Sequence, residues 1–221
     1  MIVGVVADTH VGEFLDELPQ WVLDALAGSD LILHAGDLSD GSVIRTLERI
    51  APVVAVRGDH DLPSAPRLPR RAVLQVGRHR IGLIHGKRRT TDALVVAAHA
   101  AAGRRIGWDA GRLRAMVRAF DGNDVDAVVF GHWHEVVVAH VDGVLVMNPG
   151  AVCPWGSLEG GRPPRPGAAG VADRLVRRYR RQLGDEAMAP SVGRIRIDVG
   201  DVEGEITPRP SCRGQGGETQ E

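Results

Sequence analysis

The stretch Ile2-Val3-Gly4-Val5-Val6-Ala7, followed at once by Asp8-Thr9-His10, is the part of the sequence that decides the fold. Its compact run of β-branched residues is typical of a buried strand. In open parallel sheets, functional groups collect just beyond the carboxyl ends of the strands. The stretch therefore predicts a parallel strand that presents Asp8 and His10 at its end.

Two further units with the same rhythm follow. Helical spacing over Leu18–Leu26 leads to a strand at Leu31–Ala35, which ends at Gly36-Asp37. A helical pattern over Ser42–Ile50 leads to a strand at Val53–Val56, which ends at Arg57-Gly58-Asp59-His60-Asp61. This order predicts a parallel sheet with right-handed crossovers, so that the polar ends of three strands meet at one edge.

The second half of the chain changes to hairpins. Two apolar runs flank Asp142-Gly143, a strong signal for a two-residue hairpin turn, and another pair flanks residues 77–80. Between these hairpins, helical patterns near 92–102 and 110–120 precede a strand at 125–130 that ends at Gly131-His132-Trp133-His134. We expect an α/β fold in which two mixed β-sheets, flanked by helices, form a four-layer α/β/β/α sandwich.

Length and composition are those of a single soluble domain. The chain has 221 residues, of which 43% are hydrophobic and 25% charged. We expect one domain over residues 1–207, with a loop and a basic helix inserted at about 152–190. Residues 208–221 are polar and rich in glycine, and are expected to form a disordered tail.

Charge and cysteine content limit the classes of partner. A formal net charge of −1 gives no long-range attraction to nucleic acid or to an anionic membrane. No segment approaches the roughly 18 apolar residues of a membrane span, and two distant cysteines indicate no disulfide framework. We expect a cytoplasmic protein without nucleic-acid or membrane partners, and nothing in the sequence specifies its oligomeric state.

Carboxylates and imidazoles recur at the predicted strand ends. Imidazole nitrogen and carboxylate oxygen together suit borderline divalent ions such as Mn, Fe or Zn. One such segment could simply end a strand, but a whole series in chain order predicts a metal site. Its members are Asp8, His10, Asp37, Asp59, His60, His85, His132 and His134.

The ordered motifs resemble those of a known family, the calcineurin-like metallophosphoesterases, and in particular their small bacterial and archaeal phosphodiesterase branch. The resemblance covers residues 1 to about 151 and implies a phosphodiesterase or phosphatase that acts on a small phosphate ester. It also implies two divalent metal ions, with manganese as first choice and Fe, Zn, Ni or Mg as alternatives. The matching motifs are Asp8-x-His10, Gly36-Asp37, Gly58-Asp59-His60-Asp61, His85-Gly86, Gly131-His132-x-His134 and Asn148-Pro149-Gly150.

The resemblance also implies roles for these residues. Asp8, His10 and His134 would bind one metal, Asp59, His85 and His132 the other, and Asp37 would bridge the two. A hydroxide between the ions would attack phosphorus, because coordination lowers the pKa of water by many units.

Three residues would act next to the metals. His60 would bind a phosphate oxygen or protonate the leaving group, and Asp40 would orient it. Trp133 lies between two expected ligands and would pack beside the site or form an aromatic wall for the substrate.

One residue departs from the family pattern, which normally has asparagine where this chain has Asp59. Asp8, Asp37 and Asp59 bring three negative charges to the two ions, where asparagine would leave two. The added carboxylate is expected to hold its metal more tightly. It should also make that metal a weaker Lewis acid and less attractive to an anionic substrate.

Two other functions stay open. Related folds include nucleases, although the neutral charge and the lack of an added DNA-binding domain count against this reading. Other relatives are non-catalytic protein-binding scaffolds that lack several ligands, whereas here every metal position keeps a ligand-capable side chain. Outside the ligand set, His34 is expected to be a hydrogen-bonded core residue and Asn148 to stabilise a turn. Asp61 would either support the ligands from behind or form a local turn.

Overall fold

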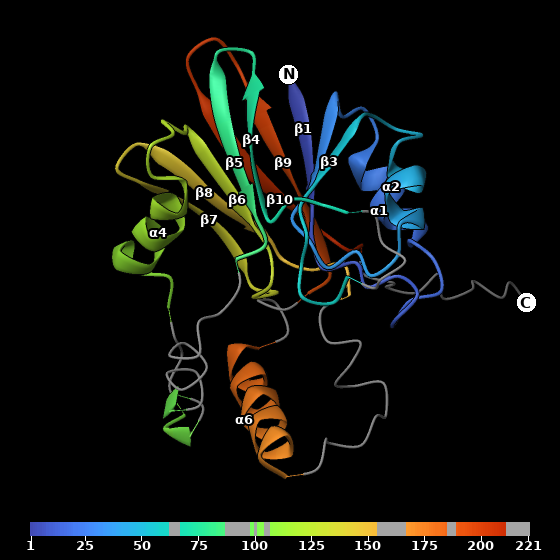
Figure 1. The fold of residues 1–221 in the computed structure, drawn as a ribbon, viewed down its shortest axis with the longest axis vertical. Helices are drawn as coiled ribbons and strands as arrows, with labels where there is room; N and C mark the ends of the chain where they lie inside the picture. The colour runs from blue at the N-terminus through green and yellow to red at the C-terminus, as the bar shows by residue number, and fades with distance from the viewer. Residues whose placement is uncertain are drawn as a thin grey trace, which may run out of the picture.

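The computed structural model describes residues 1–61, 67–86, 98–99, 101–103, 107–153, 167–184 and 189–210. Within these ranges, two mixed five-stranded sheets pack face to face, and helices cover their outer faces (Figure 1). The expected four-layer α/β/β/α sandwich is confirmed. No helix in the described ranges is long and apolar enough to cross a membrane.

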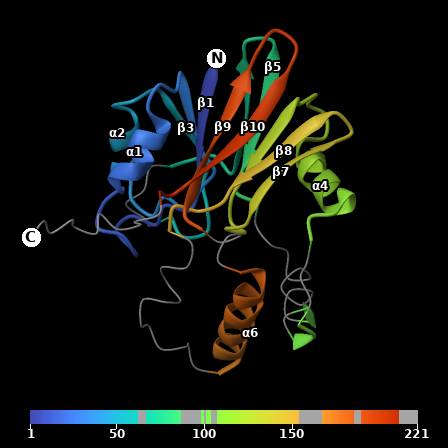
Figure 2. The ribbon, with the colours of Figure 1, turned by 180° about the vertical axis from the view of Figure 1, so that it is seen from behind.

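The first sheet is built around the N-terminal strand. β1 pairs in parallel with β2 and antiparallel with β9, and β2 continues in parallel to the short β3. Figure 2 shows the antiparallel pair β9 and β10 from behind. In spatial order the strands are β10 (Val202–Pro208), β9 (Ser191–Ile197), β1 (Ile2–Val6), β2 (Leu31–His34) and β3 (Val53–Ala55).

The second sheet has three parallel central strands between two antiparallel edge strands. The predicted hairpin turn at Asp142 and Gly143 is confirmed, since both residues have positive φ angles, 51° and 82°. In spatial order the strands are β4 (Arg71–Val76), β5 (His79–Ile84), β6 (Ala127–Phe130), β8 (Val144–Pro149) and β7 (Val136–Val141).

Strand β1 is buried on both of its faces, as its sequence predicted. Val3 and Val5 belong to the core between the sheets, together with Ile81 of β5. Val6, on the opposite face, packs in a second cluster with Val22. A strand in this position has no face left for water, which explains its nearly continuous apolar sequence.

Helices cover the outer faces of both sheets. α1 (Gln20–Leu26) and α2 (Ser42–Leu47) lie on the first sheet. On the second sheet, α4 (Ala110–Val117) continues into the short helix η1 (Arg118–Phe120), whose Phe120 is buried. Gly82 of β5 makes room for this ring, because a Cβ there would lie 2.9 Å from it.

The basic helix expected within the insertion at about 152–190 is present as α6 (Gly167–Leu183) and lies beneath the loop end of the sandwich (Figure 1). Its Tyr179 is 4% exposed and joins an apolar cluster with Leu113 and Trp133. Most of the helix expected at 92–102 lies outside the described residues. The same holds for much of the loop at 152–166 and for the tail from residue 211 onward.

Candidate metal centre

The loops after β1 and β2 are joined by backbone hydrogen bonds that continue the sheet beyond its last strand residues. The Asp8 N–H donates to the Gly36 carbonyl at 3.0 Å, and the His10 N–H donates to the Asp37 carbonyl at 3.1 Å. The loop after β6 is bound to the loop after β1, because the His132 N–H donates to the Asp8 carboxylate at 3.0 Å. Segments far apart in sequence thus meet at one edge, as predicted.

Left-handed backbone conformations concentrate at this edge. Such a conformation is uncommon outside glycine, and it persists only where the surrounding structure enforces it. It turns Asp8 and His10, two residues apart, toward the same centre. The candidate ligands with positive φ are Asp8 (52°), His10 (50°), Asp37 (57°), His132 (66°) and His134 (55°).

The first candidate group consists of Asp8, His10 and His134. Each offers one ligand atom, and these atoms lie within 4.8 Å of one another. His134 Nε2 is 3.2 Å from Asp8 Oδ1. All three residues are buried, with exposed fractions of 0%, 3% and 8%. We call this trio the inner group.

The second candidate group consists of Asp37, His85 and His132, again with ligand atoms within 4.8 Å of one another. His85 Nε2 lies 3.2 Å from Asp37 Oδ2 and 3.3 Å from His132 Nδ1. Asp59 adds a carboxylate at this side, since its Oδ2 lies 3.5 Å from the same His132 nitrogen. The side chains of His132 and Asp59 are 18% and 32% exposed. We call His85, His132 and Asp59 the outer group.

Asp37 lies between the two groups. Its Oδ2 is 3.2 Å from His85 Nε2 and 3.9 Å from His10 Nε2. Its Oδ1 accepts the backbone N–H of His60 at 2.7 Å. One carboxylate oxygen therefore faces imidazoles of both groups.

Charge pairing within the site perturbs the pKa values of its members. Burial alone would raise the pKa of Asp37, but the hydrogen bond and charge of His85 outweigh it and hold the pKa below its ordinary value. Burial would lower the pKa of His85, but the bond to Asp37 and the charge of Asp8 raise it to about 9. Without metal, His85 thus carries a proton at neutral pH, which a metal ion would displace.

Contacts on the far side of a ligand ring fix which of its nitrogens faces the metal site. His85 Nδ1 donates to the Ala35 carbonyl at 2.7 Å, which leaves Nε2 for a metal. Glycine is required beside it, because a Cβ at Gly36 would lie 2.7 Å from that same Nδ1. A side chain at Gly58 would collide with the Asp37 carboxylate.

His34 lies at the end of β2, fully buried, and is the hydrogen-bonded core residue that its sequence predicted. The Gly36 N–H donates to its Nδ1 at 3.2 Å, so the ring proton sits on Nε2, 3.1 Å from Thr9 Oγ1. Burial lowers the pKa of His34 to about 3 and keeps the ring neutral.

Two polar residues tie the loops together. Asp61 Oδ1 accepts the N–H groups of Leu38 at 2.8 Å and Ser39 at 3.1 Å, and its Oδ2 accepts that of Gly58 at 2.6 Å. Asp61 therefore fulfils both readings of its sequence, since it closes its own turn and supports the Asp37 loop. Asn148 is buried, donates to the Gly131 carbonyl and accepts the Gly150 N–H, each at 3.0 Å.

The structure brings Glu13, rather than Asp40, to His60. His60 Nδ1 lies 3.2 Å from Oε1 and 3.1 Å from Oε2 of Glu13. Asp40 Oδ1 instead accepts the Ser42 N–H at 2.7 Å, where it caps the start of α2. The first backbone N–H groups of a helix have no partner within the helix and compete for a nearby carboxylate. In this chain the Ser42 N–H binds the Asp40 carboxylate, which therefore points to α2 and not to His60. The expected orientation of His60 by Asp40 is not seen.

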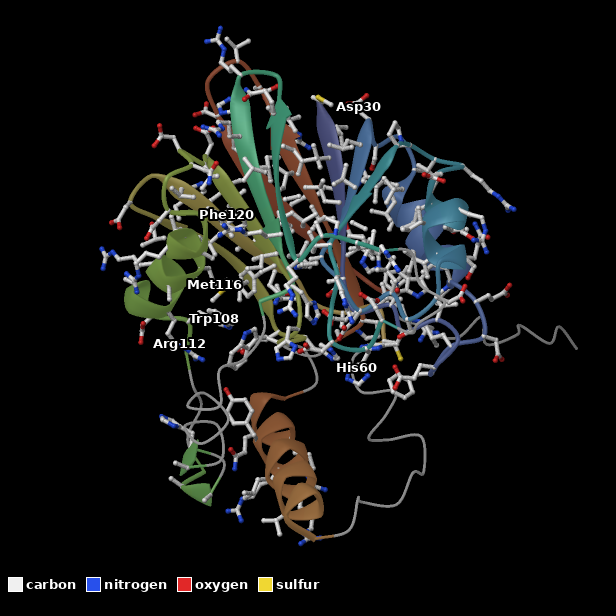
Figure 3. The ribbon with its side chains drawn as sticks, in the orientation of Figure 1. Asp30, His60, Trp108, Arg112, Met116 and Phe120 are labelled. Atoms are coloured by element: carbon white, nitrogen blue, oxygen red, sulfur yellow. The ribbon has the colours of Figure 1, made fainter. Side chains whose placement is uncertain are left out.

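Trp133 is 8% exposed and packs under α4. Its ring centroid lies 5.5 Å from that of Trp108, and the Arg112 guanidinium lies 5.0 Å from it. Figure 3 shows Trp108 next to Arg112 of α4, and His60 at the loop end of the sandwich. Trp133 thus packs against Trp108 and next to the candidate ligand His132, and its role in binding substrate stays a prediction.

The two mixed sheets and the paired His and Asp groups define a metallophosphoesterase-like α/β/β/α protein. The chain belongs to the calcineurin-like phosphoesterase superfamily, since the sequence profile of that superfamily's domain matches residues 1–164.

Curated relatives and solved structures agree with this assignment. A probable metallophosphoesterase of Methanothermobacter thermautotrophicus is 31% identical over 154 residues, which cover 68% of this chain and 77% of that protein. One from Methanocaldococcus jannaschii is 32% identical over 162 residues, covering 72% and 73%.

The solved structures share the fold. A novel archaeal phosphodiesterase superposes with a TM-score of 0.54 at 18% identity, over 94% of this chain and 100% of that chain. Vps29 of Entamoeba histolytica complexed with zinc superposes with a TM-score of 0.57 at 23% identity, over 95% and 100%.

Proposed function

We propose that the protein hydrolyses a phosphate ester of a small molecule with the help of two divalent metal ions. The observation that carries this proposal is the pair of ligand groups that meet at Asp37, whose Oδ2 faces His10 on one side and His85 on the other. The donors, imidazole nitrogen and carboxylate oxygen, fit borderline divalent ions.

Asp8, His10 and His134 would hold one ion, Asp59, His85 and His132 would hold the other, and Asp37 would contact both. When bound, the ions would supply an activated water and neutralise charge on the phosphoryl oxygens. Manganese is our first choice of metal, and Fe, Zn, Ni and Mg are alternatives that the same donor set accepts. The choice of metal rests on donor chemistry alone.

The remaining side chains would bind and orient the ester. The side chain of His60 is 46% exposed, and its backbone N–H is bound to Asp37. The ring can therefore reach a substrate while the backbone stays in place. From there it would donate a hydrogen bond to a phosphate oxygen or a proton to the leaving group. Asp59 and His132 are the partly exposed candidate ligands, so the ester would enter on their side of the site.

Charge favours a phosphodiester over a phosphomonoester. Three carboxylates against two divalent ions leave an excess of one positive charge, where the family's usual asparagine in place of Asp59 would leave two. A less positive centre loses more of its attraction for a dianionic monoester than for a monoanionic diester. We therefore propose phosphodiesterase activity on a small diester, in line with the archaeal phosphodiesterase that shares the fold.

The test combines metal analysis with hydrolysis of bis-p-nitrophenyl phosphate and p-nitrophenyl phosphate. The proposal expects two ions per chain and faster turnover of the diester. His85→Asn should abolish turnover, whereas His140→Asn, a matched change at an exposed position of β7, should leave it unchanged. A chain that binds no metal and turns over neither ester would instead support a scaffold role like that of non-catalytic relatives.

A further inference from the structure

We propose that Glu13 is a positioning residue of this site, and that its carboxylate sets the ring orientation of His60. The inference rests on the proposed function, because His60 acts only if a phosphate ester is hydrolysed. The sequence pattern did not single out Glu13. The structure does, through its contacts.

The carboxylate of Glu13 is surrounded by donors. Both of its oxygens contact His60 Nδ1, at 3.2 and 3.1 Å, and the Ser39 hydroxyl donates to Oε2 at 3.2 Å. The same Oε2 lies 3.6 Å from His10 Nδ1. The side chain of Glu13 is 19% exposed and that of His60 46%, so the carboxylate is sheltered while the imidazole reaches outward.

The contact with Glu13 fixes which nitrogen of the His60 ring carries a proton. A carboxylate only accepts hydrogen bonds, so Glu13 keeps a proton on His60 Nδ1. When the ring carries two protons, the one on Nε2 is then the proton available to the substrate. In His10, Nδ1 faces Glu13 while Nε2 faces Asp37 at 3.9 Å. A carboxylate behind a ligand histidine keeps the lone pair of the opposite nitrogen available for a metal. Glu13 thus orients the substrate-facing histidine, and its carboxylate also lies close to a candidate ligand.

A tight turn holds Glu13 in this place. The carbonyl of His10 accepts the N–H groups of Glu13 at 3.2 Å and Phe14 at 2.9 Å. Gly12, with a φ of 83°, reverses the chain and donates to the Leu15 carbonyl at 2.7 Å. The Phe14 ring lies 5.2 Å from that of His10 and 6.4 Å from that of His60. The turn therefore begins on a candidate ligand and brings Glu13 back over it.

The kinetic test compares leaving groups in the full-length, metal-loaded protein. Proton donation by His60 matters most for a poor leaving group, so we expect Glu13→Gln to lower kcat for diphenyl phosphate by about tenfold or more. Turnover of bis-p-nitrophenyl phosphate, whose leaving group needs little help, should change by less than about threefold. Glu17→Gln, the same change at an exposed position of the same loop, should alter neither. Equal losses with both esters for Glu13→Gln would overturn the proposal.

A second variant separates positioning from independent action. In His60→Ala, adding Glu13→Gln should cost no further turnover of diphenyl phosphate, because the two residues act as one unit. Additive losses would show that Glu13 acts without His60 and would contradict the inference.

Two further measurements do not depend on turnover. Long-range ¹H–¹⁵N spectra of the zinc-loaded chain should show the His60 proton on Nδ1 in the wild type, with this preference lost in Glu13→Gln. Metal analysis should find equal ion content in both proteins. The atoms of His10, Glu13 and His60 lie within 4.8 Å of one another and could themselves hold an ion. A loss of metal in Glu13→Gln would make Glu13 a ligand and overturn the positioning role.

The outcomes keep this inference apart from the proposed function. If the wild type hydrolyses neither ester, the proposed function fails, while the spectra still test the bond between Glu13 and His60. If the wild type is active but His60 shows the same tautomer in both proteins, the positioning role alone fails.

Discussion

The inner and outer groups of the candidate metal centre use the same kinds of donor in different surroundings. The inner residues Asp8, His10 and His134 are all at least nine-tenths buried. In the outer group only His85 is buried to that degree, while Asp59 and His132 border solvent. Fixed, sheltered donors lose little freedom when an ion binds, and exposed donors lose more. We expect one tightly held ion and one that exchanges more readily.

The change that should break both groups together is Asp37→Asn. It removes the negative charge that faces His10 and His85, so both ions should bind at least about 100-fold more weakly, and turnover should be lost. Calorimetric titration with Mn²⁺ checks this for each ion separately. A variant that lost only the weaker ion would show that Asp37 serves the outer group alone.

The buried residue His34, which lies behind the inner group, should make the stability of the protein depend on pH. Its folded pKa of about 3 lies below the ordinary 6.5, so the unfolded chain binds more protons between these pH values. Stability should therefore fall as pH drops below 6.5, by an amount on the order of 4 kcal/mol when pH 3 is reached. Urea unfolding at several pH values would show this, with His34→Gln as the variant that lacks the titrating group. An equal pH dependence in both proteins would contradict it.

A substitution of Asp61 tests how the loop that carries Asp59 is held to the metal centre. Asp61→Ala leaves three backbone N–H groups without their carboxylate, and bonds to a charged acceptor contribute about 1.5–3 kcal/mol each before water replaces them. Because the site is partly exposed, we expect a net loss of about 2 kcal/mol in the free energy of unfolding. Affinity for the outer ion, which Asp59 would hold, should fall more than affinity for the inner ion. Weakening of both ions to the same extent would contradict the separation of the groups.

The smallest change is Asp59→Asn, which restores the residue usual in the family. It should leave two ions bound, and it should raise turnover of p-nitrophenyl phosphate relative to bis-p-nitrophenyl phosphate by a few fold. The reason is the added positive charge, which attracts a dianion more than a monoanion. Steady-state kinetics with both esters measures the ratio. Indistinguishable ratios and metal occupancies would show that the charge of Asp59 does not set the preference between the two esters.

The sequence predicted the sheets and the strand ends well because both depend on local patterns. A β-branched apolar run such as Ile2–Ala7 indicates a buried strand, and polar residues directly after parallel strands lie at one edge of the sheet. The partner of His60 could not be predicted in this way, because it depends on the turn that carries Glu13 and on the capping of α2 by Asp40. The single available signal was an acid three residues after His10. The three bonds of Asp61 depend equally on how separate loops approach each other.

The left-handed turns at the candidate ligands have a consequence for how such a centre can change over generations. Among side chains other than glycine, Asn, Asp and His adopt this backbone most readily, and these include good metal ligands. Positions such as Asp8, Asp37 and His134 are therefore restricted twice, once by chemistry and once by conformation. A replacement by Gly removes the ligand, and a replacement of Asp by Asn removes its charge, at little cost to the backbone. The sandwich fold can therefore persist after the metal ligands are lost, and a descendant could use the same fold for another purpose.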